Sequence, residues 1–149
     1  MNVGKNTWMA LITFVAGVCA TLLGLGVIPS DESNFHAPHW VVTAAGFAFM
    51  FTGVAIAFGA DRRRAQLSGM QGVVVDIACI VIMGSLGMIA TWVGFGPGER
   101  NFHGGVPFVS AEANALFGRV MFGGGALICW LAEGAMIVAM LRRWRKAVA

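Results

Sequence analysis

The chain has 149 residues, of which 58% are hydrophobic and only 11% are charged, and its formal net charge is +3. In soluble domains about a quarter of the residues are charged, so this composition excludes an ordinary soluble domain. Disorder is excluded as well, because it requires low hydrophobicity. The mean hydropathy of +0.77 and the 21 glycines are typical of closely packed membrane helices. The sequence therefore specifies a membrane fold, but its composition specifies no activity.

Four long apolar stretches follow one another along the chain, at residues 7–28, 40–59, 72–96 and 114–141. Each has roughly 20 residues or more, enough to cross a hydrocarbon core of about 30 Å. A backbone in lipid must satisfy its own hydrogen bonds, so all four are predicted to be helices. The first is longer than the apolar region of a usual signal peptide, and we expect it to be retained. Ser110 is expected to cap the fourth helix, with Glu112 in its first turn. The predicted fold is all-α: one polytopic domain over residues 1–149, arranged as a four-helix bundle.

The basic residues are distributed unevenly between the predicted loops. They gather before the first span, between the second and third spans, and after the fourth: Lys5, Arg62, Arg63, Arg64, Arg142, Arg143, Arg145 and Lys146. Few lie in the other two loops, residues 29–39 and 97–113. The positive-inside rule therefore predicts that both termini and the "DRRR" loop face the cytoplasm. Because the basic runs adjoin the span ends, we expect no nucleic-acid partner.

The two loops predicted to face outward share a short motif, which reads "DESNFHAPHW" in the first and "GERNFHGGVP" in the second. At a constant offset of 67 the shared residues are Glu32, Asn34, Phe35 and His36 with Glu99, Asn101, Phe102 and His103. Gly46 and Gly53 align with Gly118 and Gly125 if the second loop is five residues longer. These matches predict two tandem helix-loop-helix repeats of the same orientation, over residues of about 7–60 and 71–141.

The histidines of these loops are the candidate cofactor ligands. His36 and His103, with His39 as a third candidate, offer imidazoles that can bind a metal or serve as axial haem ligands. The alternative is structural: the Asn residues turn the chain, the Phe residues anchor it in the interface, and the His side chains bond to backbone carbonyls. The sequence lacks the C-x-x-C, H-E-x-x-H and C-x-x-C-H spacings. We therefore expect no cofactor and keep metal or haem binding as an alternative.

Three ionisable residues lie inside the predicted spans, where charge is costly and therefore suggests a role: Asp76, Arg119 and Glu133. Counted from the span ends, Asp76 and Glu133 are both roughly 8–12 Å inside the cytoplasmic side, so they share one site if their helices touch. Such a site suits a proton or cation conduit, whereas the structural alternative is a bond to Arg62–Arg64, to Ser85 or to backbone. For Arg119 we expect an ion pair with Glu112, Glu32 or Glu99, with binding of an anionic lipid or substrate headgroup as the alternative.

Small residues at a spacing of four, such as Ala16, Ala20 and Gly24, are predicted to let helices approach closely. The stretches "NFHAPHWVVTAAGFAFMFTG" and "GFGPGERNFHGG…GRVMFGGGA" resemble a group of uncharacterised small four-span bacterial inner-membrane proteins. The resemblance covers both outer loops and the second and fourth spans. It implies a multi-pass protein of a bacterial inner membrane, and it implies no catalytic residue, cofactor or partner.

Three functions remain open at this point. The favoured one is a small integral membrane interaction or accessory subunit, or a homo-oligomer, without catalysis of its own, because the loops are short and the spans carry small-residue faces. Its partners would be the lipid bilayer and a membrane protein or second copy. The alternatives are a proton, cation or small-solute conduit using Asp76 and Glu133, and metal or haem binding by His36 and His103. An enzyme is not favoured, because the sequence shows no nucleophile–base set.

Overall fold

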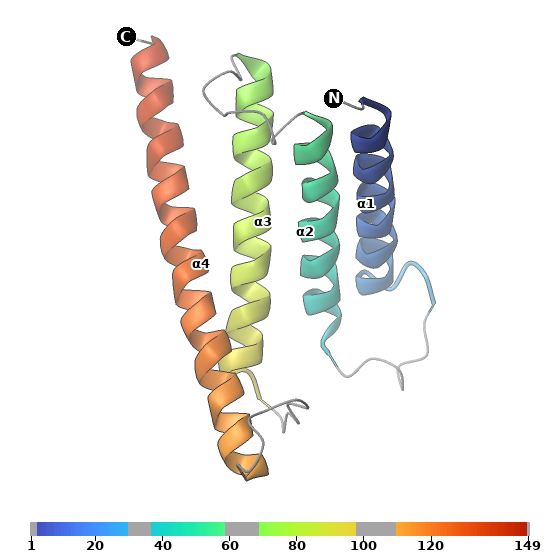
Figure 1. Ribbon diagram of the computed structural model, residues 1–149, viewed down its shortest axis with the longest axis vertical. Helices are drawn as coiled ribbons and strands as arrows, with labels where there is room; N and C mark the ends of the chain where they lie inside the picture. The colour runs from blue at the N-terminus through green and yellow to red at the C-terminus, as the bar shows by residue number, and fades with distance from the viewer. Residues whose placement is uncertain (1–2, 30–36, 59–68, 98–109, 149) are drawn as a thin grey trace.

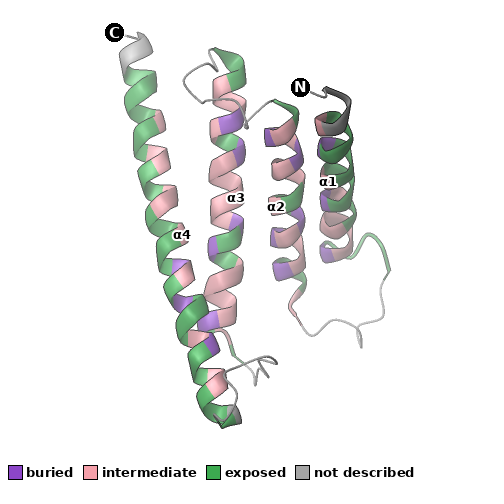
Figure 2. Cartoon of the chain, viewed as in Figure 1, coloured by how far each residue is buried: buried purple, intermediate pink, exposed green. Residues whose placement is uncertain are grey.

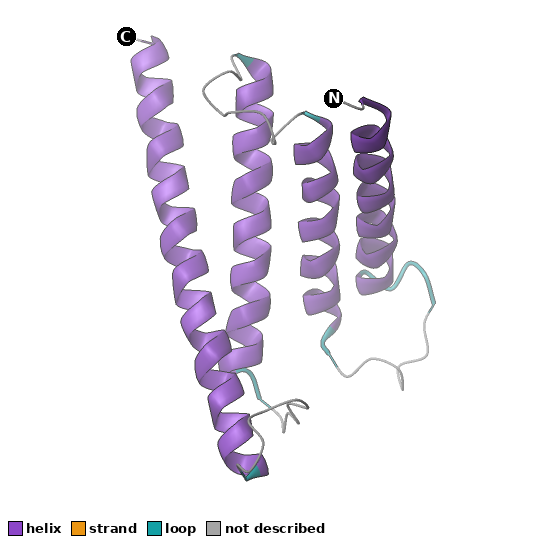
Figure 3. Ribbon diagram, viewed as in Figure 1, coloured by secondary structure: helices purple, strands orange, loops and turns teal. Residues whose placement is uncertain are grey.

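Four helices form the protein in a computed structural model, which describes residues 3–29, 37–58, 69–97 and 110–148. They are α1 (Val3–Gly24), α2 (His39–Ala57), α3 (Met70–Phe95) and α4 (Ala111–Val148). Every regular element among the described residues is helical (Figure 3). Each helix contains a stretch long and apolar enough to cross a membrane. The prediction of an all-helical fold with four such helices is therefore confirmed.

The helices stand side by side in a row (Figure 1). Packing joins α1 to α2, α2 to α3 and α3 to α4, so α1 and α4 are the edges. The described part of the chain thus forms an open row rather than the closed bundle expected from four packed spans. Val3 and Val148, the first and last described residues, lie at the same end of the row, which we call the terminal end; the opposite end is the distal end.

Local sequence explains where the helices begin and end. Gly26 adopts a φ of 72°, which suits a residue without a Cβ, and this turn ends α1 before residue 28. Pro38 precedes α2, where its missing N–H costs no helical hydrogen bond. At the start of α4 the Ser110 hydroxyl accepts a hydrogen bond from the Ala113 amide at 3.3 Å, and Glu112 lies in the first turn, which confirms the predicted cap.

Each of α1 and α2 meets the other through two glycines spaced by seven residues, Gly17 and Gly24 on α1 and Gly46 and Gly53 on α2. A Cβ at Gly17 would meet the backbone of Met50, and a Cβ at Gly53 would lie 2.7 Å from the Ala10 carbonyl oxygen. The two backbones therefore touch where only glycine fits. Of the three residues expected from the spacing of four, Gly24 is buried, whereas Ala16 is exposed and Ala20 is half-buried.

The pair α3 and α4 packs in a similar way near the distal end. A Cβ at Gly94 would lie 2.8 Å from the Gly123 amide nitrogen, and a Cβ at Gly87 would lie 3.2 Å from the Trp130 ring. Buried residues are sparse on α4 and absent from Leu127 to Arg145 (Figure 2). The terminal half of α4 is therefore the least covered part of the described structure.

Candidate functional site

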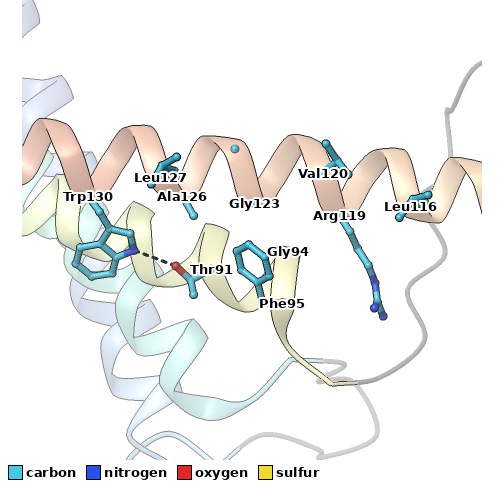
Figure 4. A pocket seen from close by; sticks show the side chains of 11 residues that line it. Thr91, Gly94, Phe95, Leu116, Arg119, Val120, Gly123, Ala126, Leu127 and Trp130 are labelled. Carbon is cyan, nitrogen blue, oxygen red and sulfur yellow. Dashed lines mark hydrogen bonds between the residues drawn. The ribbon is translucent and has the colours of Figure 1, made fainter.

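A groove of about 740 Å³ lies between α3 and α4 in the distal half of the row (Figure 4). We call it the α3–α4 groove. Residues of both helices line it: Thr91, Gly94, Phe95, Leu116, Arg119, Val120, Gly123, Gly124, Ala126, Leu127 and Trp130. On the α4 side of the groove, Gly123 is buried against α3 and Gly124 is exposed. A Cβ at Gly124 would meet nothing within 4 Å, whereas a Cβ at Gly123 would lie 2.9 Å from the Phe95 ring.

Thr91 and Trp130 of the groove wall are joined by a hydrogen bond. The Trp130 indole N–H donates to the Thr91 hydroxyl oxygen at 3.0 Å (Figure 4). The Thr91 hydroxyl in turn donates to the Gly87 carbonyl oxygen at 2.7 Å. These bonds tie α4 to α3, and they leave an apolar surface toward the groove.

A smaller cavity of about 340 Å³ adjoins this groove, and both are lined by Thr91, Phe95 and Trp130. Trp40 of α2 and Trp92 of α3 also line the cavity. Their rings meet edge to face, with centroids 6.4 Å apart and planes at 86°, a geometry that favours aromatic pairing. The distal half of the row therefore presents aromatic walls drawn from three helices.

Arg119 is the charged residue that the structure brings to the α3–α4 groove. It is half-buried on α4, two turns after the helix begins, and its carbonyl oxygen would lie 3.2 Å from a Cβ at Gly94. Its side chain extends away from α4 on the side where α3 ends (Figure 4). Of the carboxylates expected to bind it, Glu112 is exposed, and Glu32 and Glu99 lie outside the described residues.

Asp76 forms an ion pair with Arg143, which joins α3 to α4 at the terminal end. Arg143 Nη1 lies 3.0 Å from Asp76 Oδ2, and the Asp76 side chain is 13% exposed. The expected partners were Arg62–Arg64, which lie outside the described residues, and Ser85, which is buried on α3. The partner that the structure gives Asp76, Arg143, is not among those expected from the sequence.

Glu133 occupies a slot left by the missing side chain of Gly84. Its Oε1 atom would lie 2.7 Å from a Cβ at Gly84. Its Oε2 atom is buried and has no hydrogen-bond partner in the described part of the chain. The slot therefore holds an acidic group deep in the α3–α4 interface.

The single site expected for Asp76 and Glu133 is not formed. Glu133 lies at the level of Gly84, eight residues along α3 from Asp76, a rise of about 12 Å. The sequence-based estimate counted each depth from the end of its apolar stretch, but α4 continues to Val148 and places Arg143 level with Asp76. The two carboxylates therefore lie at different levels along α3.

The candidate cofactor ligands are only partly described. His36 and His103, with the rest of the repeated loop motif, lie outside the described residues. His39 is exposed at the start of α2, where its carbonyl oxygen accepts a hydrogen bond from the Thr43 hydroxyl at 3.1 Å. Among the described residues, no group of three or more His, Cys, Asp or Glu side chains could hold a metal ion.

A second sequence match, missed in the sequence analysis, becomes visible through these contacts. The segments "GVCATLLG" and "GMIATWVG" begin at Gly17 and Gly87 and share the pattern G-x-x-A-T-x-x-G. In both, the threonine hydroxyl donates to the carbonyl oxygen of the first glycine, from Thr21 at 2.9 Å and from Thr91 at 2.7 Å. The pattern was detectable in the sequence at a constant offset of 70 residues.

The α3–α4 groove, the Glu133 slot and the Asp76–Arg143 ion pair all belong to the interface between α3 and α4. The described residues therefore concentrate their unusual chemistry on one helix pair, while α1 and α2 pack through glycine and threonine. The chain matches no protein-family model, and comparisons with curated proteins and with solved structures find no match.

Proposed function

We propose that the protein is a small integral membrane interaction subunit without catalysis of its own, and that it assembles with a second copy of itself through α4. The observation that carries the proposal is the poor coverage of α4. This helix has 38 residues, yet its buried residues are only Gly118, Gly123 and Ala126 among those whose side chains are described.

The side of α4 that faces away from α3 is continuous and apolar. Six exposed residues form this side, each three, four or seven positions after the one before. We call it the α4 edge face: Phe117, Met121, Ile128, Leu131, Ala135 and Val138. By helical periodicity these residues lie opposite Gly123, Ala126 and Trp130, which face α3.

A second copy suits this face because the face carries no charge. In a two-fold pair the same residues meet across the axis, so any charge near the axis would face its own like. Helices in lipid associate by close packing, and small side chains such as that of Ala135 allow it. In the proposed pair the two α4 helices run parallel to each other. The two-fold axis that relates the two copies lies along the membrane normal.

The proposal includes an orientation and a location. We place both termini and the "DRRR" loop on the cytoplasmic side of a bacterial inner membrane. The distribution of basic residues supports this orientation, and so does the position of Val3 and Val148 at the same end of the row. The location rests on the resemblance of the loops to bacterial inner-membrane proteins.

The proposal also includes a tandem repeat of two helix pairs. Support comes from the contacts of Gly24 with the His39 carbonyl and Thr43, and of Gly94 with the Arg119 carbonyl and Gly123. In this alignment Gly24 of α1 corresponds to Gly94 of α3, 70 residues later. Thr43 of α2 corresponds to Gly123 of α4, 80 residues later. This register replaces the alignment of Gly46 and Gly53 with Gly118 and Gly125, since a Cβ at Gly125 would meet nothing within 4 Å.

Cysteine cross-linking in native membranes tests the assembly. A variant without Cys19, Cys79 and Cys129 receives a single cysteine, either at Ala135 on the α4 edge face or at Ile12 on the exposed side of α1. We expect oxidation to give a covalent dimer with Ala135→Cys and little with Ile12→Cys. Equal cross-linking at both positions, or a monomer with Ala135→Cys, would overturn self-assembly through α4. A cross-link from Ala135→Cys to a different membrane protein would replace the second copy with that partner.

A further inference from the structure

We propose that the α3–α4 groove binds an anionic phospholipid, with one acyl chain along the groove and the phosphate at Arg119. Arg119 and Trp130 place the groove on the side of α4 toward α3, and its outer rim at Val120 and Gly124 adjoins the α4 edge face. Lipid binding at Arg119 is therefore tested with variants that lie outside the edge face. No contact described above assigns an occupant to the groove.

The dimensions of the groove favour an acyl chain over a protein helix. The lining of α4 runs from Leu116 to Trp130, a rise of about 21 Å along the helix, which exceeds the depth of one leaflet, about 15 Å. A helix with side chains is at least about 10 Å wide, so this length of helix fills about 1,600 Å³. The groove provides about 740 Å³, which is in the range of small-molecule sites.

The surface chemistry of the groove also favours a hydrocarbon chain. Val120 and Leu127 form one wall, the Phe95 ring lies against Gly123, and the polar atoms of Thr91 and Trp130 are bonded to each other. No polar atom of that pair demands a ligand. A long apolar chain therefore loses no hydrogen bond by entering.

The distal end of the groove supplies the charge. Arg119 lies two turns inside α4, and its side chain extends toward the end of the row where α3 finishes (Figure 4). A long arginine side chain in a span reaches toward headgroup depth, and its planar guanidinium matches a phosphate with two parallel hydrogen bonds. An amphiphile with an apolar tail and an anionic head complements both ends of this groove.

Two pairs of variants isolate the groove from the rest of α4. Leu116→Trp enlarges a side chain that lines the groove and lies outside the α4 edge face, and Leu141→Trp is its control at an exposed position of the same helix beyond the groove. Arg119→Gln removes the charge, and Arg142→Gln is its control beyond the groove. Helical circular dichroism and a single size-exclusion peak verify that each variant is folded.

The full chain is reconstituted in a mixture of phosphatidylcholine and phosphatidylglycerol, extracted in mild detergent, and examined by native mass spectrometry for bound lipid. We expect preferential retention of phosphatidylglycerol, lowered about tenfold by Arg119→Gln and by Leu116→Trp and unchanged by the two controls. Arg119→Lys should keep part of the preference. Equal retention of both lipids, or retention unaffected by Arg119→Gln, would overturn the proposal. Cross-linking of Leu116→Cys to a second copy would show a protein occupant instead, and Ala135→Cys tests the assembly separately.

Discussion

Two acidic side chains of the α3–α4 interface are accommodated in different ways. Asp76 has a cationic partner on the facing helix, Arg143, whereas Glu133 Oε2 is buried without a hydrogen-bond partner in the described part of the chain. A carboxylate removed from water needs a partner, because its desolvation is costly. Gly84 provides space for Glu133 but no hydrogen-bonding side chain. The same helix pair thus holds one ion-paired acid and one acid whose buried Oε2 atom has no partner among the described residues.

At this scale we predict that Asp76 is energetically coupled to Arg143 and not to Glu133. A double-mutant cycle of Asp76→Asn with Arg143→Gln should give a coupling free energy of unfolding of about 0.5–1 kcal/mol, since Arg143 is largely exposed. The cycle of Asp76→Asn with Glu133→Gln should be additive within about 0.5 kcal/mol, because about 12 Å separates their levels on α3. Unfolding in detergent measures both. Coupling above this limit between Asp76 and Glu133 would restore the single site.

At the scale of elements, glycines determine how closely the helices pack. Gly17 and Gly53 meet backbone of the facing helix, and Gly94 meets the backbone of Gly123. By contrast, Gly134 is exposed on α4 with nothing within 4 Å of a Cβ built there. Glycine therefore stabilises the fold where it meets the backbone of a facing helix, and it destabilises the helix where it is exposed.

Alanine substitutions should reveal this difference as opposite signs. Gly17→Ala places a methyl group against the Met50 backbone, which cannot move as a side chain can, and we expect it to lower the free energy of unfolding by about 1–3 kcal/mol. Gly134→Ala meets open space and removes a poor helix former, so we expect a gain of up to about 1 kcal/mol. Thermal unfolding in one detergent compares them. A loss with Gly134→Ala as large as that with Gly17→Ala would contradict the described packing.

The sequence predicted the helices well because length and hydropathy decide which segments enter a bilayer. It placed the end of the first helix too late, since the run of apolar residues continues past Gly26, where the backbone turns. It ended the fourth helix too early, because the basic residues from Arg142 onward leave the apolar span but still favour a helix.

The candidate site was harder to predict, because its parts come from two helices whose relative register no single span reveals. The contact of Asp76 with Arg143 needs that register, and so does the placement of Glu133 against Gly84. The seven-residue spacing of Gly87 and Gly94 was present in the sequence. Its meaning depends on knowing that α4 lies opposite.

At the scale of the whole molecule, the open row explains why the two edges differ. The edge helix α1 packs on α2 through Ala10, Gly17 and Gly24, spaced evenly along most of its length. The other edge helix, α4, buries residues only in its distal half and is joined to α3 at the terminal end by the Asp76–Arg143 ion pair. Between these ends α4 meets α3 through Trp130 and Glu133, while the opposite side of α4, the α4 edge face, is exposed.

The orientation of the row in the membrane gives the last prediction. The two ends of the described chain lie at one end of the row, and the basic residues next to that end predict that it faces the cytoplasm. In a variant without the native cysteines, Ser33→Cys and Ser68→Cys place a thiol in a distal loop and in the "DRRR" loop respectively. A membrane-impermeant maleimide is added to cells whose outer layers are permeable and whose inner membrane is intact. It should label Ser33→Cys at once. It should label Ser68→Cys only after the inner membrane is opened, because the positive charges beside that position oppose its transfer across the bilayer.

Labelling of both positions after lysis is the control for reactivity. Labelling of Ser68→Cys but not Ser33→Cys in intact cells would invert the topology and place Arg119, with its groove, in the cytoplasmic leaflet.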